Sequence, residues 1–303
     1  MTAQTQTRPL TPRRKSKLNR VTATDVCILA FLLVFSGLVL YPFYNSVLIS
    51  MTPQVVYIRE PFMLWPKALD WSSYQYVFEN KSIWMGMWTT VQITIFGTLY
   101  NIFLTVTMAY ALNHSFPGKK AVIALIMFTM YFSGGLIPTY MMIKDFGLMN
   151  TLWSMILPTG VSISYLMVMR KFFKSIPDEL EESAKIDGAN DLTIMFRIVL
   201  PLALPMVITF VIYYGVERWN EWYNGLLYIK SATKMPLQLV LRQIVQNSQT
   251  IQASESMQDA GIKPFGDGIK MATVIVTMFP VMVLYPFMQK YFVTGLTVGA
   301  VKG

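Results

Sequence analysis

The sequence has very few of the side chains that build disulfides and metal sites. Its 303 residues include one cysteine, Cys27, and one histidine, His114. A single cysteine excludes a disulfide within the chain, and one imidazole cannot form a metal site without other ligands. Cys27 opens an apolar segment and His114 belongs to a short basic turn. We therefore expect no catalytic residue and no metal site.

Signals for nucleotide binding are also missing. No segment follows the phosphate-loop pattern G-x-x-x-x-G-K-[ST]; the nearest stretch, Pro117 to Lys120, lacks the leading glycine and the final hydroxyl residue. The chain is not expected to hydrolyse ATP or to be an enzyme. If ATP drives its function, the nucleotide must be bound by a separate motor chain.

Charged residues are scarce, at 14% of the chain, whereas hydrophobic residues make up 54%. This balance lies well outside that of soluble domains and predicts a membrane protein. A helix needs about 20 mostly apolar residues to cross the hydrocarbon core. Six windows qualify, over residues 26–48, 85–112, 121–143, 148–169, 201–227 and 271–288. The predicted fold class is an all-α polytopic membrane protein with six transmembrane helices.

The positions of lysine and arginine predict the orientation. With the N-terminus inside, the cytoplasmic segments hold 15 of the 25 basic residues, in agreement with the positive-inside rule. The first window is too long for a cleaved signal peptide and is interpreted as a retained signal-anchor helix. We predict a basic cytoplasmic tail over 1–25, a transmembrane domain over 26–292 with a cytoplasmic loop at 171–201, and a cytoplasmic tail over 293–303. The net charge of +9 fits this topology and contact with anionic lipid better than nucleic-acid binding.

An acidic segment over 176–189 lies between the fourth and fifth windows. Pro177 suits the first turn of a helix, and Asp178 and Glu179 would face the positive end of its dipole. Gly188 can adopt the left-handed conformation that ends a helix, and Asn190 or Asp191 can cap a second helix. The segment predicts a short helix on the cytoplasmic face, although a solvated acidic connection is the alternative.

The spacing of this segment is that of a known signature. Glu182-Ser183-Ala184, then Gly188, then Ile198 to Pro201 resembles the cytoplasmic loop of permease subunits in binding-protein-dependent ABC importers. The family usually has Glu-Ala-Ala at these three positions, so Ser183 replaces one small residue, alanine, with another. The resemblance implies the type I ABC importer permease fold and a coupling helix that inserts into a cleft of an ABC ATPase. The coupling residues would be Glu182, Ser183, Ala184, Asp187 and Gly188.

This resemblance also implies the partners and the location. They are a second permease subunit, two ABC ATPase subunits that bind the ATP, an extracytoplasmic solute-binding protein and membrane lipid. No cofactor belongs to the chain itself. The location is a bacterial cytoplasmic (inner) membrane, crossed several times, with both termini inside.

Two further segments point to the cargo. Residues 289–303 resemble the C-terminus of sugar-importer permeases related to the maltose system. The stretch from Tyr131 to Tyr140 contains Gly134, Gly135 and Pro138, which would interrupt the third helix, and it resembles importers of complex oligosaccharides. A sugar, in particular an oligosaccharide, is the expected cargo. The alternatives are an amino acid, peptide or phosphonate carried by the same kind of importer, or an ion-coupled secondary transporter with Glu217 and Glu221 as coupling carboxylates.

The candidate substrate residues follow the fifth window. Ionisable groups at membrane depth are costly, so Glu217, Arg218 and Glu221 are expected to face a polar cavity or to pair with one another. The stretch from Trp219 to Trp222 resembles a family segment whose counterpart in the partner permease contributes to the sugar site. The predicted substrate residues are Asn220, Trp219, Glu221, Trp222 and Tyr213. An aromatic belt at the membrane surface, which needs no ligand, is the alternative.

Outside the membrane, prolines over 51–82 predict an irregular cap. Leu237, Val240, Leu241, Ile244 and Val245 form an amphipathic helical stripe. A binding protein could contact these surfaces, or the stripe could pack on neighbouring spans.

Overall fold

A computed structural model describes residues 23–251 and 265–300, and every element in these ranges is a helix. The chain divides into two units, residues 1–46 and 47–303. The described part of the first unit is a single helix, α1 (Ala23–Ser50), whose last four residues belong to the second unit. This helix has 28 residues of high hydropathy and contains Pro42. Ser46 Oγ donates to the Pro42 carbonyl at 2.7 Å. The length and composition of α1 fit a membrane crossing, as the sequence predicts.

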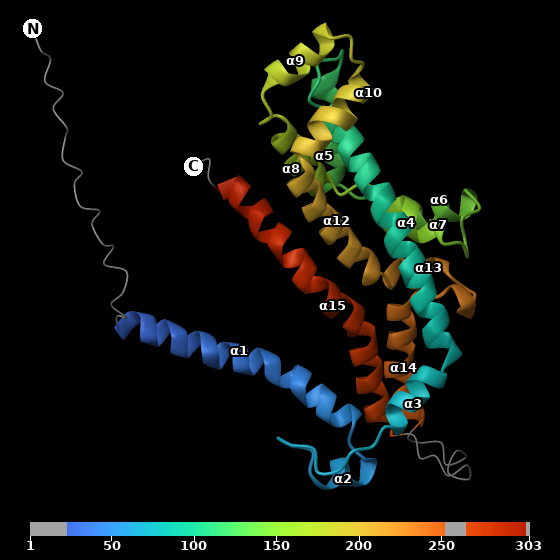
Figure 1. Ribbon diagram of the computed structural model, residues 1–303. Coiled ribbons are helices and arrows are strands. Elements are labelled where there is room, and N and C mark those ends of the chain that lie inside the picture. The colour runs from blue at the N-terminus through green and yellow to red at the C-terminus, as the bar shows by residue number, and fades with distance from the viewer. Residues whose placement is uncertain (1–22, 252–264, 301–303) are drawn as a thin grey trace, which may run out of the picture. The chain divides into compact units, whose positions relative to one another are not determined.

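The second unit is organised around α4 (Lys81–Ala111), which is 31 residues long. The Asn80 side chain caps it by accepting from the Ser82 amide at 2.9 Å. At 1.5 Å per residue the helix is about 46 Å long, enough to cross the bilayer. It packs against α8 (Ile163–Phe173), α12 (Leu204–Trp219) and α14 (Leu237–Ile251). Figure 1 shows it as the long central helix of this unit. Two short helices, α2 (Gln54–Arg59) and α3 (Ser72–Glu79), precede it.

The third predicted span is interrupted, as expected from its glycines. It consists of α5 (Lys119–Tyr131) and α6 (Leu136–Asp145), which are bent by 113° relative to each other. Gly135 sits at the break with φ of +89°, a conformation that L side chains rarely adopt.

The fourth predicted span is wrong as a single helix. The segment forms α7 (Trp153–Ile156), the 3-10 turn η1 (Leu157–Thr159) and α8 (Ile163–Phe173). Pro158 lacks the N–H that would continue the ladder of α7. The Asn101 side chain of α4 donates to the Thr159 and Gly160 carbonyls, at 2.6 and 2.8 Å. These bonds give hydrogen-bond partners to two backbone carbonyls at the interruption. Hydropathy alone detects the apolar run and misses its interruption.

The fifth predicted span ends earlier than expected. A chain of short elements, α10 (Asp191–Ile194), the π-helix η2 (Met195–Val199) and α11 (Leu200–Leu202), leads through a bend of 83° into α12 (Leu204–Trp219). The extension towards Leu227 is wrong, because Asn220 caps the end of α12 and a separate helix, α13 (Tyr223–Tyr228), follows.

The remaining elements are η3 (Ala232–Lys234), α14 (Leu237–Ile251) and α15 (Gly266–Ala300). The backbone of α15 covers the sixth predicted span and continues to Ala300; the side chains from 287 onward lie outside the described residues, and so does most of the basic N-terminal tail. In the described part, three helices are long and apolar enough to cross a membrane, or up to five if each bent pair is one span. The count of six spans stays a prediction.

The amphipathic stripe of α14 packs inside the unit. Leu237 and Val240 are buried in a cluster with Val77 of α3, Ile83 of α4 and Ala272 of α15. The interpretation of this stripe as a packing surface is therefore the one that the structure supports.

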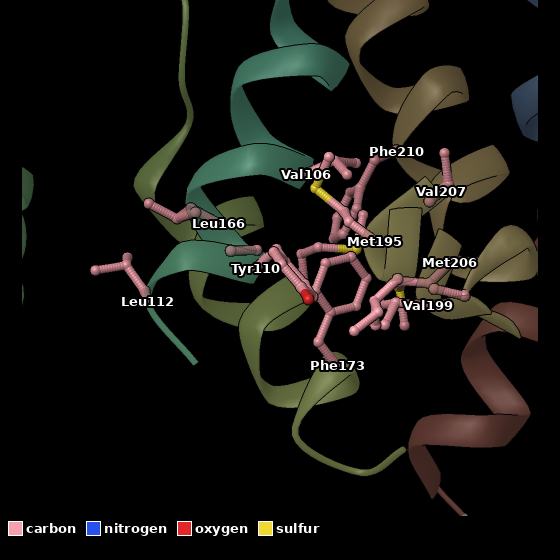
Figure 2. Close-up of a cluster of buried hydrophobic side chains, with 14 of the residues drawn as sticks. Val106, Tyr110, Leu112, Leu166, Phe173, Met195, Val199, Met206, Val207 and Phe210 are labelled. Carbon is pink, nitrogen blue, oxygen red and sulfur yellow. The ribbon is translucent and has the colours of Figure 1, made fainter. Parts of the chain in front are cut away.

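The main core lies where α4, α8 and α12 meet the loop that contains α9 (Asp178–Ile186) and α10. Figure 2 shows side chains of α4, α8, η2 and α12 converging there. Tyr110, Phe173 and Met195 are among its buried members, and Ala184 of α9 is part of the same cluster. The acidic helix is thus continuous with the core of the bundle.

Candidate functional site

The acidic helix α9 forms as the sequence predicts, with one difference at its start. Pro177 is the N-cap, with extended backbone angles, and not the first helical residue. At the other end the Ala189 amide donates to the Ala184 carbonyl at 2.9 Å and the Gly188 amide to Lys185 at 3.0 Å. Gly188 has φ of +82°. These two bonds are the Schellman arrangement that closes a helix at a glycine.

The predicted coupling residues fall on two faces of α9. Ala184 is 9% exposed and points into the core. Glu182, Ser183, Asp187 and Gly188 are exposed. The helix therefore has one small inward residue and an outward acidic surface.

Apolar side chains are also exposed on this loop. Ile186 is 86% exposed, and Leu192 of α10 is 65% exposed. Large apolar residues next to carboxylates on a short, protruding helix are typical of a surface that a partner covers.

Polar contacts tie α9 to its surroundings. Glu181 Oε2 lies 3.0 Å from His114 Nε2, and His114 Nδ1 lies 3.0 Å from the Tyr110 carbonyl of α4. The His114 and Tyr110 rings are 4.5 Å apart. On the other side, Lys185 Nζ lies 3.8 Å from Asp191, and the Asn190 side chain caps α10 by accepting from the Thr193 amide at 2.8 Å. These contacts join α9 to the end of α4 and to α10.

At the other candidate site, the predicted pairing of Arg218 with Glu217 or Glu221 is wrong. Arg218 is 4% exposed, and its Nε and Nη2 donate to Asn101 Oδ1 of α4 at 3.0 and 2.8 Å. The guanidinium also donates to the carbonyls of Met155, Ile156 and Thr159 and to Thr159 Oγ1. These carbonyls lie at the C-terminal ends of α7 and η1, where the helix dipole is negative. Among the described residues, no carboxylate forms an ion pair with this cation.

Three of the predicted substrate residues have internal contacts. Trp219 is 8% exposed, packs with α14 and α15 and donates from Nε1 to the Thr277 carbonyl at 3.3 Å. Glu221 accepts from the Asn224 amide at 3.1 Å and from Asn224 Nδ2 at 3.0 Å. Trp222 is half-buried, and Arg242 of α14 lies over its ring at 4.1 Å.

Asn220 and Tyr213 lie on a more open face. Asn220 is exposed, donates to the Val216 carbonyl at 2.9 Å and accepts from Gln238 at 3.3 Å. Tyr213 is half-buried and its ring lies 5.6 Å from that of Tyr165 in α8. The intervening Glu217 is exposed and accepts from the Tyr165 hydroxyl at 2.6 Å. Positions 213, 217 and 220 follow the helical repeat and share one face of α12.

Sequence reasoning missed Asn101 and Tyr165. Asn101 is fully buried in the middle of α4 and joins that helix to η1 and α12. An asparagine far from either end of a 31-residue apolar helix is a signal that could have found it, because buried polar groups in membrane helices need partners. Tyr165 carries no such signal in the sequence.

Comparison with protein families identifies the chain. The family described as the binding-protein-dependent transport system inner membrane component matches residues 82–298. The chain belongs to this family. It is a membrane permease component of an ABC importer and not an enzyme, and the assignment argues against an ion-coupled secondary transporter. The match includes α4, the acidic loop and α12, so both candidate sites lie within the family domain.

Curated relatives agree with this assignment. The polygalacturonan/rhamnogalacturonan transport system permease protein YtcP of Bacillus subtilis is 39% identical over 92% of this chain and 98% of the relative. The arabinooligosaccharides transport system permease protein AraQ of Halalkalibacterium halodurans is 27% identical over 91% of this chain and 93% of the relative.

A solved structure agrees as well. A chain from a bacterial ABC transporter involved in the import of the acidic polysaccharide alginate aligns with a TM-score of 0.83 at 27% identity, over 90% of this chain and 99% of that one. This permease therefore has the all-helical polytopic fold of type I ABC importer permeases, and it is a multi-pass protein of the inner membrane.

Proposed function

We propose that this permease is one of two membrane subunits of an importer for an oligosaccharide. A solute-binding protein delivers the sugar on the outer side, and two ABC ATPase subunits bind the ATP and drive transport from the inner side. The chain itself binds no cofactor. The relatives named for polygalacturonan, arabino-oligosaccharide and alginate systems support a carbohydrate cargo over an amino acid, peptide or phosphonate.

The proposed coupling to the ATPase is supported by the two different faces of α9. Its inward residue, Ala184, belongs to the core that joins α4, α8 and α12. Its outward surface includes exposed acidic and apolar side chains, such as Glu182 and Ile186. We infer that this outward surface inserts into a cleft of an ATPase subunit that has basic side chains at its rim and apolar side chains at its base.

Coupling would then be mechanical. Closure of the ATPase pair on ATP moves α9, and the Ala184 packing and the His114–Glu181 contact transmit this motion to α4. The bundle tilts, and the cavity between the two permease subunits changes from inward-facing to outward-facing. This subunit performs no bond chemistry.

On the outer side, the binding protein would contact the cap between α1 and α4. Trp65 is 77% exposed and Trp71 is 56% exposed in this segment, and exposed aromatic residues are common anchors at protein interfaces. Among the substrate candidates, Asn220 and Tyr213 lie open enough to contact cargo. Trp219, Glu221 and Trp222 would support that face through their contacts with neighbouring helices.

Reversal of one charge on α9 tests the coupling role. In the purified four-subunit complex, we expect Glu182→Lys to abolish co-purification of the ATPase and ATP-dependent uptake, because an exposed carboxylate that faces a basic rim becomes repulsive. Asp145→Lys, at the exposed end of α6 and outside both the cap and the acidic loop, is the matched control and should leave both unchanged. Wild-type uptake by the Glu182→Lys complex would contradict the proposed function.

A further inference from the structure

The depth of Glu217 in the membrane follows from its neighbour. Arg218 bonds to Asn101 and its side chain lies across Gly97, since a Cβ on Gly97 would meet Arg218 Nε at 2.9 Å. At 1.5 Å per residue, Gly97 and Asn101 lie about 24 to 30 Å from one end of α4 and about 15 to 21 Å from the other. They are therefore near the middle of a helix that crosses a hydrocarbon core of about 30 Å. Glu217 is at the same level.

An exposed carboxylate at this depth needs a polar neighbour outside the chain. Glu217 is exposed, and its one hydrogen bond within the described residues comes from the Tyr165 hydroxyl, at 2.6 Å to Oε1. Oε2 accepts from no described residue. Ionised side chains within transmembrane segments almost always face a water-filled cavity or the interior of the bundle, because lipid contact is costly. The face of α12 that bears Glu217 is thus turned to a polar space.

We propose that Tyr165, Tyr213, Glu217 and Asn220 form a subsite for an uncharged, hydroxyl-rich sugar in the middle of the membrane. The inference rests on the proposed function and specifies its substrate class. An ionised carboxylate is an acceptor with room for several hydroxyl donors. The Tyr165 and Tyr213 rings, with centroids 5.6 Å apart, offer the apolar surface on which a pyranose ring packs. Asn220 adds an amide donor at the outer end.

The charges around this face select against an acidic sugar. Arg218, the adjacent cation, directs its donors to Asn101 and to the carbonyls of α7 and η1, so it cannot pair with a bound carboxylate. Arg242 lies over the Trp222 ring. Glu217 itself would oppose a uronate group placed beside it, a repulsive contact of the kind that builds specificity. This distinguishes the chain from an importer of polyuronate fragments, although relatives are named for such cargo.

The test uses the complete importer in proteoliposomes with its binding protein and trisaccharides of equal length. The neutral probes are arabinotriose and raffinose, and the acidic probe is trigalacturonate. We expect ATP-dependent uptake of a neutral probe to exceed that of trigalacturonate.

Glu217→Gln should lower kcat for the neutral probe by about tenfold or more, because a charge-assisted hydrogen bond is lost, while KM for the loaded binding protein stays unchanged. Glu217→Asp should restore part of the rate.

Controls separate this subsite from a purely structural role. Tyr213→Phe keeps the ring and should have a smaller effect than Glu217→Gln, and Asp145→Asn at the exposed end of α6 should have none. If the complex transports trigalacturonate in preference to neutral probes, or if Glu217→Gln leaves uptake unchanged, the inference is overturned. The proposed function would survive either result as long as Glu182→Lys abolishes uptake, and it would fail if no sugar of either class is transported.

Discussion

Arg218 joins three segments in the interior of the bundle through its hydrogen bonds. Five N–H donors of a guanidinium need acceptors when the group is buried. Here the Asn101 amide oxygen, the Thr159 hydroxyl and the last carbonyls of α7 and η1 supply them. Removal of one partner would leave a buried cation incompletely bonded, which is among the costliest single changes in a protein. We therefore expect the contact between α4, α7 and α12 to tolerate little variation.

Gly97 gives a direct test of this contact. We expect Gly97→Ala to lower the free energy of unfolding by about 1 to 3 kcal/mol, because overpacking forces a shift in a well-packed region and the nearby Arg218 side chain is held by its hydrogen bonds. Gly215→Ala on α12 is the matched control, since its Cβ would meet only Thr98 Oγ1 at 3.9 Å. Thermal unfolding of the purified complex measures both. Equal stability of the two variants would refute the tight contact.

The sequence predicts local residue roles well and distant ones poorly. The cap at Asn190 and the left-handed Gly188 depend on neighbours within a few positions, and both occur as expected. The partner of Arg218 is Asn101, 117 positions away. Glu217 and Glu221 are much closer in sequence, so a pairing rule based on helical spacing selects them and misses the amide. Tertiary packing decides this contact.

At the scale of elements, the acidic helix has clear start and stop signals, whereas the apolar segments do not. Hydropathy found α1, α4 and α15 because these are long and continuous. It could not place the breaks at Pro158 or at Asn220, where the chain changes direction inside an apolar run. Breaks at membrane depth are stable only where other groups satisfy the released backbone, as Asn101 does for the Thr159 carbonyl.

The end of α9 makes a second prediction. We expect Gly188→Ala to destabilise the last turn of this helix by about 1 to 2 kcal/mol, the cost of a left-handed conformation for an L side chain, even though no atom lies within 4 Å of the added Cβ. Faster hydrogen exchange at the Gly188-position and Ala189 amides would report it. Gly188→Asn should cost less, because asparagine adopts this conformation more readily. The same loss in both variants would contradict the left-handed backbone conformation as the cause.

At the scale of the whole molecule, orientation is the property that the sequence predicts and that the fold leaves open. The basic residues predict a cytoplasmic C-terminus and an external segment between the first two spans. Alkaline phosphatase fused after Gly303 should be inactive, and the same enzyme fused after Arg59 should be active, because it folds only outside the cytoplasm. Activity in whole cells measures this. Active enzyme at Gly303 would place the coupling loop on the wrong side for an ATPase.

The guanidinium that lies across Gly97 also limits how this subunit can change shape. Sliding or twisting of α12 along α4 would break several buried bonds at once and force the arginine into the neighbouring backbone. The two helices are therefore expected to travel as a single rigid block. The transport pathway must then open and close by rotation of this rigid pair of helices relative to the second permease subunit. The hinge would lie at the interface between the two subunits.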